Sequence, residues 1–77
     1  MPHVIVKLYP GRPEQQKKRL ADEIVKALVA TVQCKEKSVS VAIEEIEPTG
    51  WPEKVYKPDI LDKQDTLYKK PGYNPFE

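Results

Sequence analysis

The sequence predicts a small α/β fold in which one long helix connects two parallel strands. Residues 3–9 are rich in β-branched side chains that alternate along the chain, and residues 38–46 alternate in the same way. Between them, apolar residues recur at four-residue spacing. Strand, helix and strand together form a β-α-β unit with a right-handed crossover. A chain of 77 residues has room for one domain, which we expect to span residues 1–77.

The first strand is expected over His3–Tyr9. Three apolar side chains share one of its faces, namely Val4, Val6 and Leu8. Ile5 lies on the other face, which predicts that both faces are partly buried. The strand ends at Pro10-Gly11, because proline cannot extend the hydrogen-bond ladder and glycine permits the turn.

The helix is expected to begin at Pro13, whose fixed φ is already helical. Glu14 falls in the first turn, where the helix dipole favours a negative charge. Four apolar residues at four-residue spacing form one stripe: Leu20, Ile24, Leu28 and Val32. Charged residues fall largely on the other side. The pattern predicts an amphipathic helix of about five turns that ends near Gln33-Cys34.

After a second strand over Ser38–Ile46, the chain changes character. Glu47–Gly50 has the composition of a turn, and Pro52 is suited to the first position of a short helix. Pro58 either interrupts that helix or begins another that runs to about Lys70. We therefore expect an extended C-terminal helical segment, followed by irregular structure over residues 71–75.

A β-α-β unit of two strands leaves a sheet face and both sheet edges uncovered. A domain of this size buries only roughly 60% of the surface of its unfolded chain. Cys34 is the only cysteine, so no disulfide can add stability, and no Cys/His cluster suggests a metal. We expect a homodimer in which two units form a four-stranded sheet, with a hexamer of three dimers as the alternative.

Charge and hydropathy exclude several function classes. The 13 basic and 12 acidic residues give a net charge of +1, whereas nucleic-acid binders usually carry a concentrated basic face. No apolar run approaches the roughly 20 residues of a membrane span, and no secretion signal is evident at the N-terminus. A single cysteine suits a reducing compartment, so we expect a cytoplasmic protein with no nucleic-acid or membrane partner.

Pro2 is the first candidate for chemistry. Its small ring beside the initiator methionine lets methionine aminopeptidase remove Met1, which leaves a secondary amine at the start of a strand. Such an amine acts as a general base when it is neutral near the working pH. Apolar surroundings and nearby cations lower the pKa of an amine into that range. By itself, however, Pro2 is more simply interpreted as a common second residue.

Four features together resemble the 4-oxalocrotonate tautomerase family: Pro2 before a β-branched strand, Gly11-Arg12, a long amphipathic helix, and Ser38-Val39-x-Val41. The similarity extends to Trp51, and the tail Lys69–Tyr73 is most similar to the PptA-type tautomerases. The resemblance implies a tautomerase/MIF-like β-α-β fold. It also implies catalysis by the proline amine, which moves a proton between the oxygen and carbon of an enol–keto pair without a metal or organic cofactor.

The resemblance implies roles for two further residues. Arg12 matches the first active-site arginine of the family, and its planar guanidinium can donate two parallel hydrogen bonds to a substrate carboxylate. A solvated arginine at a helix start is the alternative. Trp51 matches the active-site aromatic residue, whose apolar wall would exclude water. Ordinary packing by the only tryptophan is compatible with that role.

Ser40 is a departure from the family, which has a second arginine at that position. A serine can hydrogen-bond a substrate but cannot neutralise a carboxylate, so a monoacid enol fits this chain better than a dicarboxylate. Lys37 is a conceivable replacement for the lost charge, although a solvated loop lysine is the simpler interpretation. His3 adjoins Pro2, but alternation turns its side chain to the opposite face.

Strand geometry links the chemistry to assembly. Pro2 and Arg12 bracket a strand that rises about 3.3 Å per residue, so they should lie on the order of 20 Å apart in one subunit. If both contact one small substrate, Arg12 must come from a neighbouring subunit.

The sequence thus predicts a tautomerase that isomerises a small 2-hydroxydienoate or arylpyruvate-type enol acid. Two alternatives stay open: a hydratase or dehalogenase of unsaturated acids with the same fold, in which Pro2 acts as an acid, and a non-enzymatic oligomeric binding protein.

Overall fold

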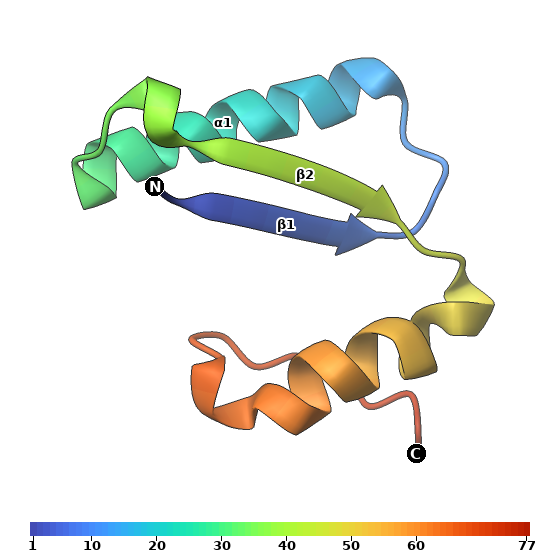
Figure 1. Ribbon diagram of the computed structural model, residues 1–77. Helices are drawn as coiled ribbons and strands as arrows, with labels where there is room; N and C mark the ends of the chain where they lie inside the picture. Colours follow the sequence, from blue (N-terminus) through green and yellow to red (C-terminus); the bar gives the residue numbers. More distant parts are fainter. The chain divides into compact units, whose positions relative to one another are not determined.

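The computed structural model describes residues 1–77, whose contacts fall into two compact units, Met1–Glu45 and Ile46–Glu77. The first unit contains strand β1 (His3–Leu8), helix α1 (Glu14–Val32) and strand β2 (Ser40–Glu45) (Figure 1). The two strands are parallel and form a two-stranded sheet. The predicted α/β class, with two parallel strands joined by a long helix, is confirmed. The single domain expected over residues 1–77 stays a prediction.

The strands pair from His3 opposite Ser40 to Leu8 opposite Glu45. β2 begins two residues later than predicted because Glu36–Ser38 form a 3-10 turn, η1. The backbone N–H of Ser38 donates to the carbonyl of Lys35 at 3.0 Å, and the Ser38 hydroxyl donates to the same oxygen at 2.8 Å. These local bonds replace the ladder bonds that a longer strand would require.

Helix α1 begins one residue later than predicted. Pro13 is its N-cap rather than its first helical residue, because its ψ of 153° is extended although its φ of −66° suits a helix. The carbonyl of Pro13 accepts hydrogen bonds from the N–H groups of Gln16 and Lys17. At the other end, Gln33 is the C-cap in the left-handed conformation, with φ 60° and ψ 45°. The predicted end near Gln33-Cys34 is confirmed.

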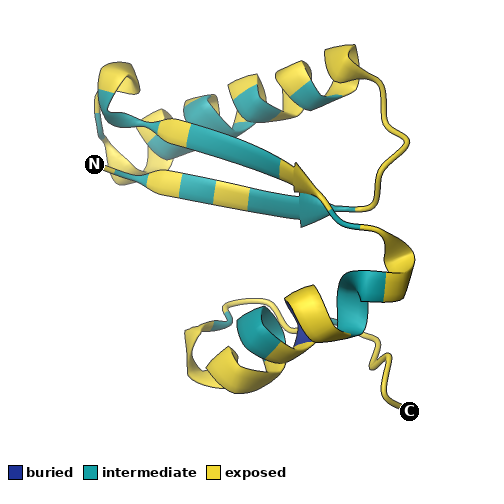
Figure 2. Ribbon diagram, turned by 45° about the vertical axis from the view of Figure 1, so that its right-hand side comes forward, coloured by how far each residue is buried: buried dark blue, intermediate teal, exposed yellow.

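Helix α1 packs against one face of the sheet, and half-buried residues alternate with exposed ones along it (Figure 2). The half-buried stripe is Lys17, Ala21, Ile24, Val25 and Leu28. Leu20 and Val32, the two ends of the predicted stripe, are exposed. On the sheet, Val4, Val6 and Leu8 are half-buried, and Ile5 on the other face is 52% exposed. That face is therefore more open than the sequence predicted. No residue of Met1–Glu45 is fully buried.

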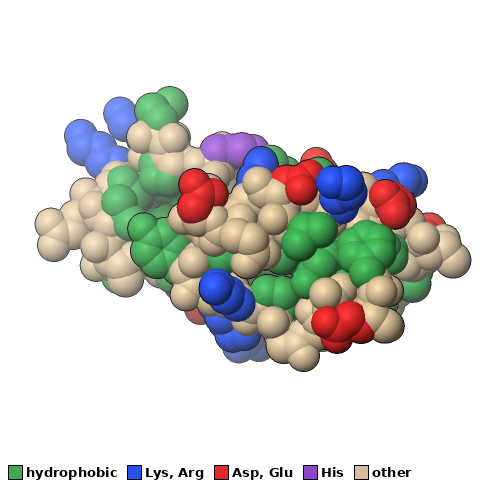
Figure 3. Space-filling model, turned by 90° about the horizontal axis from the view of Figure 1, so that it is seen from below, with side chains coloured by type: hydrophobic (Ala, Val, Ile, Leu, Met, Phe, Trp, Pro, Cys, Tyr) green, Lys and Arg blue, Asp and Glu red, His purple; other side chains and the backbone are tan.

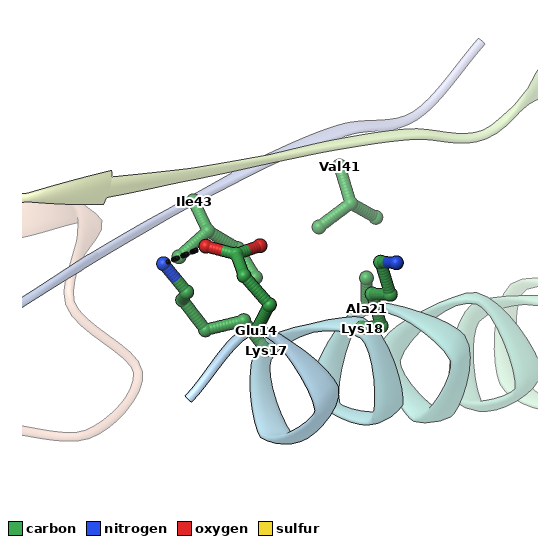
Figure 4. A pocket seen from close by; sticks show the side chains of 6 residues that line it. All are labelled: Glu14, Lys17, Lys18, Ala21, Val41 and Ile43. Carbon is green, nitrogen blue, oxygen red and sulfur yellow. Dashed lines mark ion pairs between the residues drawn. The ribbon is translucent and has the colours of Figure 1, made fainter. Parts of the chain in front are cut away.

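Lys17 ties the first turn of α1 to the end of β2. Its ammonium lies 2.7 Å from a carboxylate oxygen of Glu14 and 3.4 Å from one of Glu45. Figure 4 shows the Lys17–Glu14 pair between the helix and β2, beside Ile43. The hydrogen bond from Lys17 lowers the pKa of Glu14, and the same bond raises the pKa of Lys17.

The second unit contains three short helices: η2 (Pro48–Gly50), η3 (Pro52–Ile60) and η4 (Leu61–Thr66). Pro52 is the first residue of η3, as predicted. Pro58, however, lies inside η3, which has π-helical geometry. Proline lacks an N–H and its ring clashes with the carbonyl four residues earlier, and the wider turn relieves that clash. At the end of η3, the N–H of Leu61 accordingly reaches the carbonyls of both Lys57 and Tyr56.

The helical segment ends at Thr66 rather than near Lys70. Lys63 already departs from helical geometry, with φ −130° and ψ 38°, and Leu67 is extended. Val55 and Tyr56 on η3 are the only buried side chains of the chain, at 5% and 6% exposure.

The remaining surface is mixed in charge. Basic and acidic side chains lie close to one another on the face that Figure 3 shows, with hydrophobic side chains exposed between them. None of the helices combines the length and the apolar character that crossing a membrane requires.

The Glu14–Lys17 pair predicts acid sensitivity. Because the pKa of Glu14 is lower in the folded chain than in the unfolded one, its contribution to stability is present above pH 4.5 and is lost as pH falls through the folded-state pKa. We expect Glu14→Gln to be less stable than the wild type at pH 7 and to approach it at acidic pH. Thermal unfolding at fixed protein concentration over pH 3–7 checks this. Glu53→Gln is the control at another exposed glutamate, and an equal pH dependence in both variants would contradict the assignment.

Candidate active site

Pro2 lies half-buried immediately before β1. Its carbonyl accepts a hydrogen bond from the N–H of Ser40 at 3.1 Å, so the pairing of the two strands extends to Pro2. Met1, by contrast, is fully exposed. The backbone of Pro2 is therefore held at the end of the sheet, while the residue before it is accessible to an aminopeptidase.

The side chain of Ser40 contacts His3. The two residues are opposite each other in the parallel pairing, and the Ser40 Oγ lies 2.6 Å from the His3 Nδ1. Paired residues of parallel strands point to the same face, and alternation with Val4 and Val41 places this pair on the face away from α1. No local sequence pattern connects His3 with Ser40, because the contact depends on the strand register.

Arg12 follows the turn at the other end of β1. Gly11 has a φ of +117°, which L-residues with a side chain rarely adopt, so this glycine sets the path into Arg12. The guanidinium donates a hydrogen bond to the Gln16 Oε1 at 3.1 Å. That partner is neutral, so the bond leaves the positive charge of Arg12 in place. Arg12 and Gln16 border a shallow hollow of about 230 Å³ with Leu8, Lys17 and Leu20.

The structure therefore groups three residues and separates a fourth. Pro2, His3 and Ser40 meet where the two strands begin. Arg12 lies beyond the opposite end of β1, which has six residues and spans on the order of 20 Å. No single small acid can contact Pro2 and Arg12 of the same chain.

Trp51 belongs to the second unit, where it is half-buried at the N-cap of η3. Its indole Nε1 donates a hydrogen bond to the hydroxyl of Tyr73 at 2.9 Å. The structure thus connects Tyr73 of the C-terminal tail to the predicted site aromatic.

Residues 2–52 match the family model described as tautomerase enzyme. The chain belongs to the tautomerase family. Tautomerase PptA of Cronobacter sakazakii is 43% identical over 74 residues, which cover 95% of this chain and 97% of that protein. A probable tautomerase of Xylella fastidiosa is 38% identical over 73 residues, covering 95% of this chain and 89% of that one. The PptA-type resemblance that the sequence suggested is confirmed.

Solved structures agree with this family. YwhB, a homologue of 4-oxalocrotonate tautomerase, aligns with a TM-score of 0.59 and 35% identity, over 60% of this chain and 75% of its own. TomN, another homologue, aligns with a TM-score of 0.63 and 30% identity, over 65% of this chain and 77% of its own. The chain is thus an isomerase of the tautomerase type, which favours the enzymatic interpretation over a non-enzymatic binding protein.

A substitution at Gly11 tests whether its positive φ constrains the turn before Arg12. Gly11→Ala places a Cβ in open space but at a φ that alanine adopts only with strain, on the order of 1–3 kcal/mol. We expect urea unfolding to show that loss of stability. Gly72→Ala, which also meets open space but has no such φ, is the control and should be close to neutral. Equal stabilities for the two variants would show that Gly11 does not constrain the turn.

Proposed function

We propose that this tautomerase interconverts the enol and keto forms of a small 2-hydroxydienoate or arylpyruvate-type acid, with the nitrogen of Pro2 as the general base after removal of Met1. The observation that carries the proposal is the position of Pro2. Its ring is half-buried and its carbonyl is bonded to Ser40, while Met1 is fully exposed.

Removal of Met1 changes the chemistry of the Pro2 nitrogen. In the peptide bond the lone pair is delocalised into the carbonyl, whereas in the free secondary amine it can accept a proton. The amine takes the proton of the enol hydroxyl, the C=C double bond shifts to become C=O, and a proton is returned to carbon. The O–H bond is broken and a C–H bond is formed, with no net oxidation, so proton transfer alone completes the reaction.

Arg12 is proposed to bind the substrate carboxylate from a neighbouring subunit. The support is the separation of Pro2 and Arg12 by the length of β1, together with the positive charge that the Arg12–Gln16 bond leaves in place. The open sheet face at Ile5 and the lack of a buried residue in Met1–Glu45 support an assembly of subunits. A homodimer is proposed, with a hexamer as the alternative.

Ser40 is proposed to bind a neutral substrate oxygen rather than a second carboxylate. Its hydroxyl is bonded to the imidazole of His3, and neither group supplies the fixed positive charge of an arginine. One arginine and one hydroxyl suit an acid with a single carboxylate. Trp51 is proposed as the apolar wall that excludes water from the proton transfer.

Cys34 supports a cytoplasmic location for this activity. It is a free, half-buried thiol, and thiols persist in the reducing cytosol.

Pro2→Ala tests the base. The substitution keeps a small second residue, so Met1 can still be removed, but it replaces the secondary amine by a primary one. We expect kcat/KM for phenylpyruvate enol to fall by about 10²–10⁴. Intact-mass measurement of both proteins confirms that Met1 is absent, so that the amines are compared directly. Undiminished turnover in the alanine variant would falsify the mechanism.

The same samples separate tautomerisation from hydration or dehalogenation. A base must be neutral near pH 7, whereas those reactions require protonated Pro2. Titration of the Pro2 nitrogen by ¹⁵N NMR reports which form is present.

Ser40→Arg tests the substrate class. Placing an arginine at this position should raise kcat/KM for the dicarboxylate 2-hydroxymuconate relative to phenylpyruvate enol, by about tenfold for one charge-assisted hydrogen bond. Ser40→Ala is the control, which removes the hydroxyl without adding charge and should not favour the dicarboxylate. An unchanged preference in Ser40→Arg would place Ser40 outside the substrate site.

A further inference from the structure

The C-terminal tail after Thr66 folds back onto η3. The ring of Tyr73 packs on that of Tyr56 with centroids 5.6 Å apart and planes tilted by 54°. Phe76 contacts the same ring edge-on, at 5.8 Å and 71°. Tyr56 is one of the two buried side chains of the chain, so the tail supplies part of the small core of the second unit.

The end of the tail forms a local turn that does not involve the Tyr73 hydroxyl. The N–H of Phe76 donates to the Asn74 Oδ1 at 2.9 Å, and the N–H of Glu77 donates to the Asn74 carbonyl at 3.3 Å. These bonds close a turn that places Phe76 against Tyr56. Removal of one phenol oxygen therefore leaves the two ring contacts of the tail intact.

The Tyr73 hydroxyl forms a hydrogen bond with Trp51. It accepts the hydrogen bond of the indole Nε1–H at 2.9 Å. An indole has one donor, and the partner of that donor selects among the orientations of the ring. Trp51 is only half-buried, so packing alone surrounds it incompletely. Tyr73 thus contacts both the buried ring of Tyr56 and the N–H edge of the Trp51 indole.

We propose that Tyr73 is a positioning residue, through which the C-terminal tail fixes the indole of Trp51 and so sets the apolar wall of the active site. The inference rests on the proposed function, in which Trp51 borders the substrate. It assigns the tail a role in selecting substrates with a flat apolar group, because a fixed indole offers such a group a preformed surface.

Tyr73→Phe tests the link with a spectroscopic signature that does not require turnover. Trp51 is the only tryptophan, so the ¹H–¹⁵N spectrum contains a single indole N–H signal. Loss of the hydrogen bond should shift this signal and accelerate its exchange with solvent. Tyr68→Phe is the matched control, because Tyr68 is fully exposed, and it should leave the indole signal unchanged. An unmoved indole signal in Tyr73→Phe overturns the proposal.

Kinetics then separate positioning from general stability. We expect Tyr73→Phe to raise KM for phenylpyruvate enol by about 3- to 10-fold, the size of one net hydrogen bond, with little change in kcat. In a Trp51→Phe background the same substitution should have no further effect, because the indole that it positions is absent. An unchanged KM, or an equal effect in both backgrounds, contradicts the proposal. Failure of the proline mechanism can be distinguished from failure of the Tyr73 proposal. The first would appear as undiminished turnover in Pro2→Ala, with the indole signal of Tyr73→Phe still shifted, and the second as an unmoved indole signal.

Discussion

An extended strand separates the two groups that the proposed reaction requires, the amine of Pro2 and the guanidinium of Arg12. β1 holds Pro2 before its first residue and the Gly11–Arg12 turn after its last. The rise per residue of an extended strand varies little. The length of β1 therefore fixes the distance between Pro2 and Arg12 within one chain. In the proposed reaction, each subunit would contribute Pro2 to one site and Arg12 to another. Assembly of subunits would then be a requirement of the chemistry and not only of stability.

The packing of the first unit also favours assembly of subunits. Helix α1 covers one sheet face, yet no residue of Met1–Glu45 is fully buried, and Ile5 is exposed on the other face. Small domains gain stability mainly through the fraction of surface that they bury. An interface that covers Ile5 would bury apolar surface beside the His3–Ser40 pair, which lies on the same face. The surface that stabilises the assembly and the surface that binds substrate would then be adjacent.

Much of the first unit could be predicted because its patterns are strong and local. Alternation identified the two strands, and four-residue spacing identified α1. Two errors arose at prolines: Pro13 has a helical φ but an extended ψ, and Pro58 is accommodated inside a π-helix. The late start of β2 arose from the bond of the Ser38 hydroxyl to the carbonyl of Lys35. The site was harder to predict, because the His3–Ser40 contact depends on register and joins residues 37 positions apart. The Trp51–Tyr73 bond likewise requires the tail to fold back, which no local pattern indicates.

Subunit mixing measures whether Pro2 and Arg12 of one site come from different subunits. Pro2→Ala and Arg12→Ala variants, each inactive, are unfolded together, refolded as an equal mixture and assayed with phenylpyruvate enol. If Pro2 and Arg12 of one site come from different subunits, random assembly restores about a quarter of the wild-type turnover, because that share of sites has both residues intact. If the two residues act within one chain, every site in the mixture lacks one of them. A mixture that stays as inactive as its components would show that no site combines Pro2 and Arg12 of different subunits.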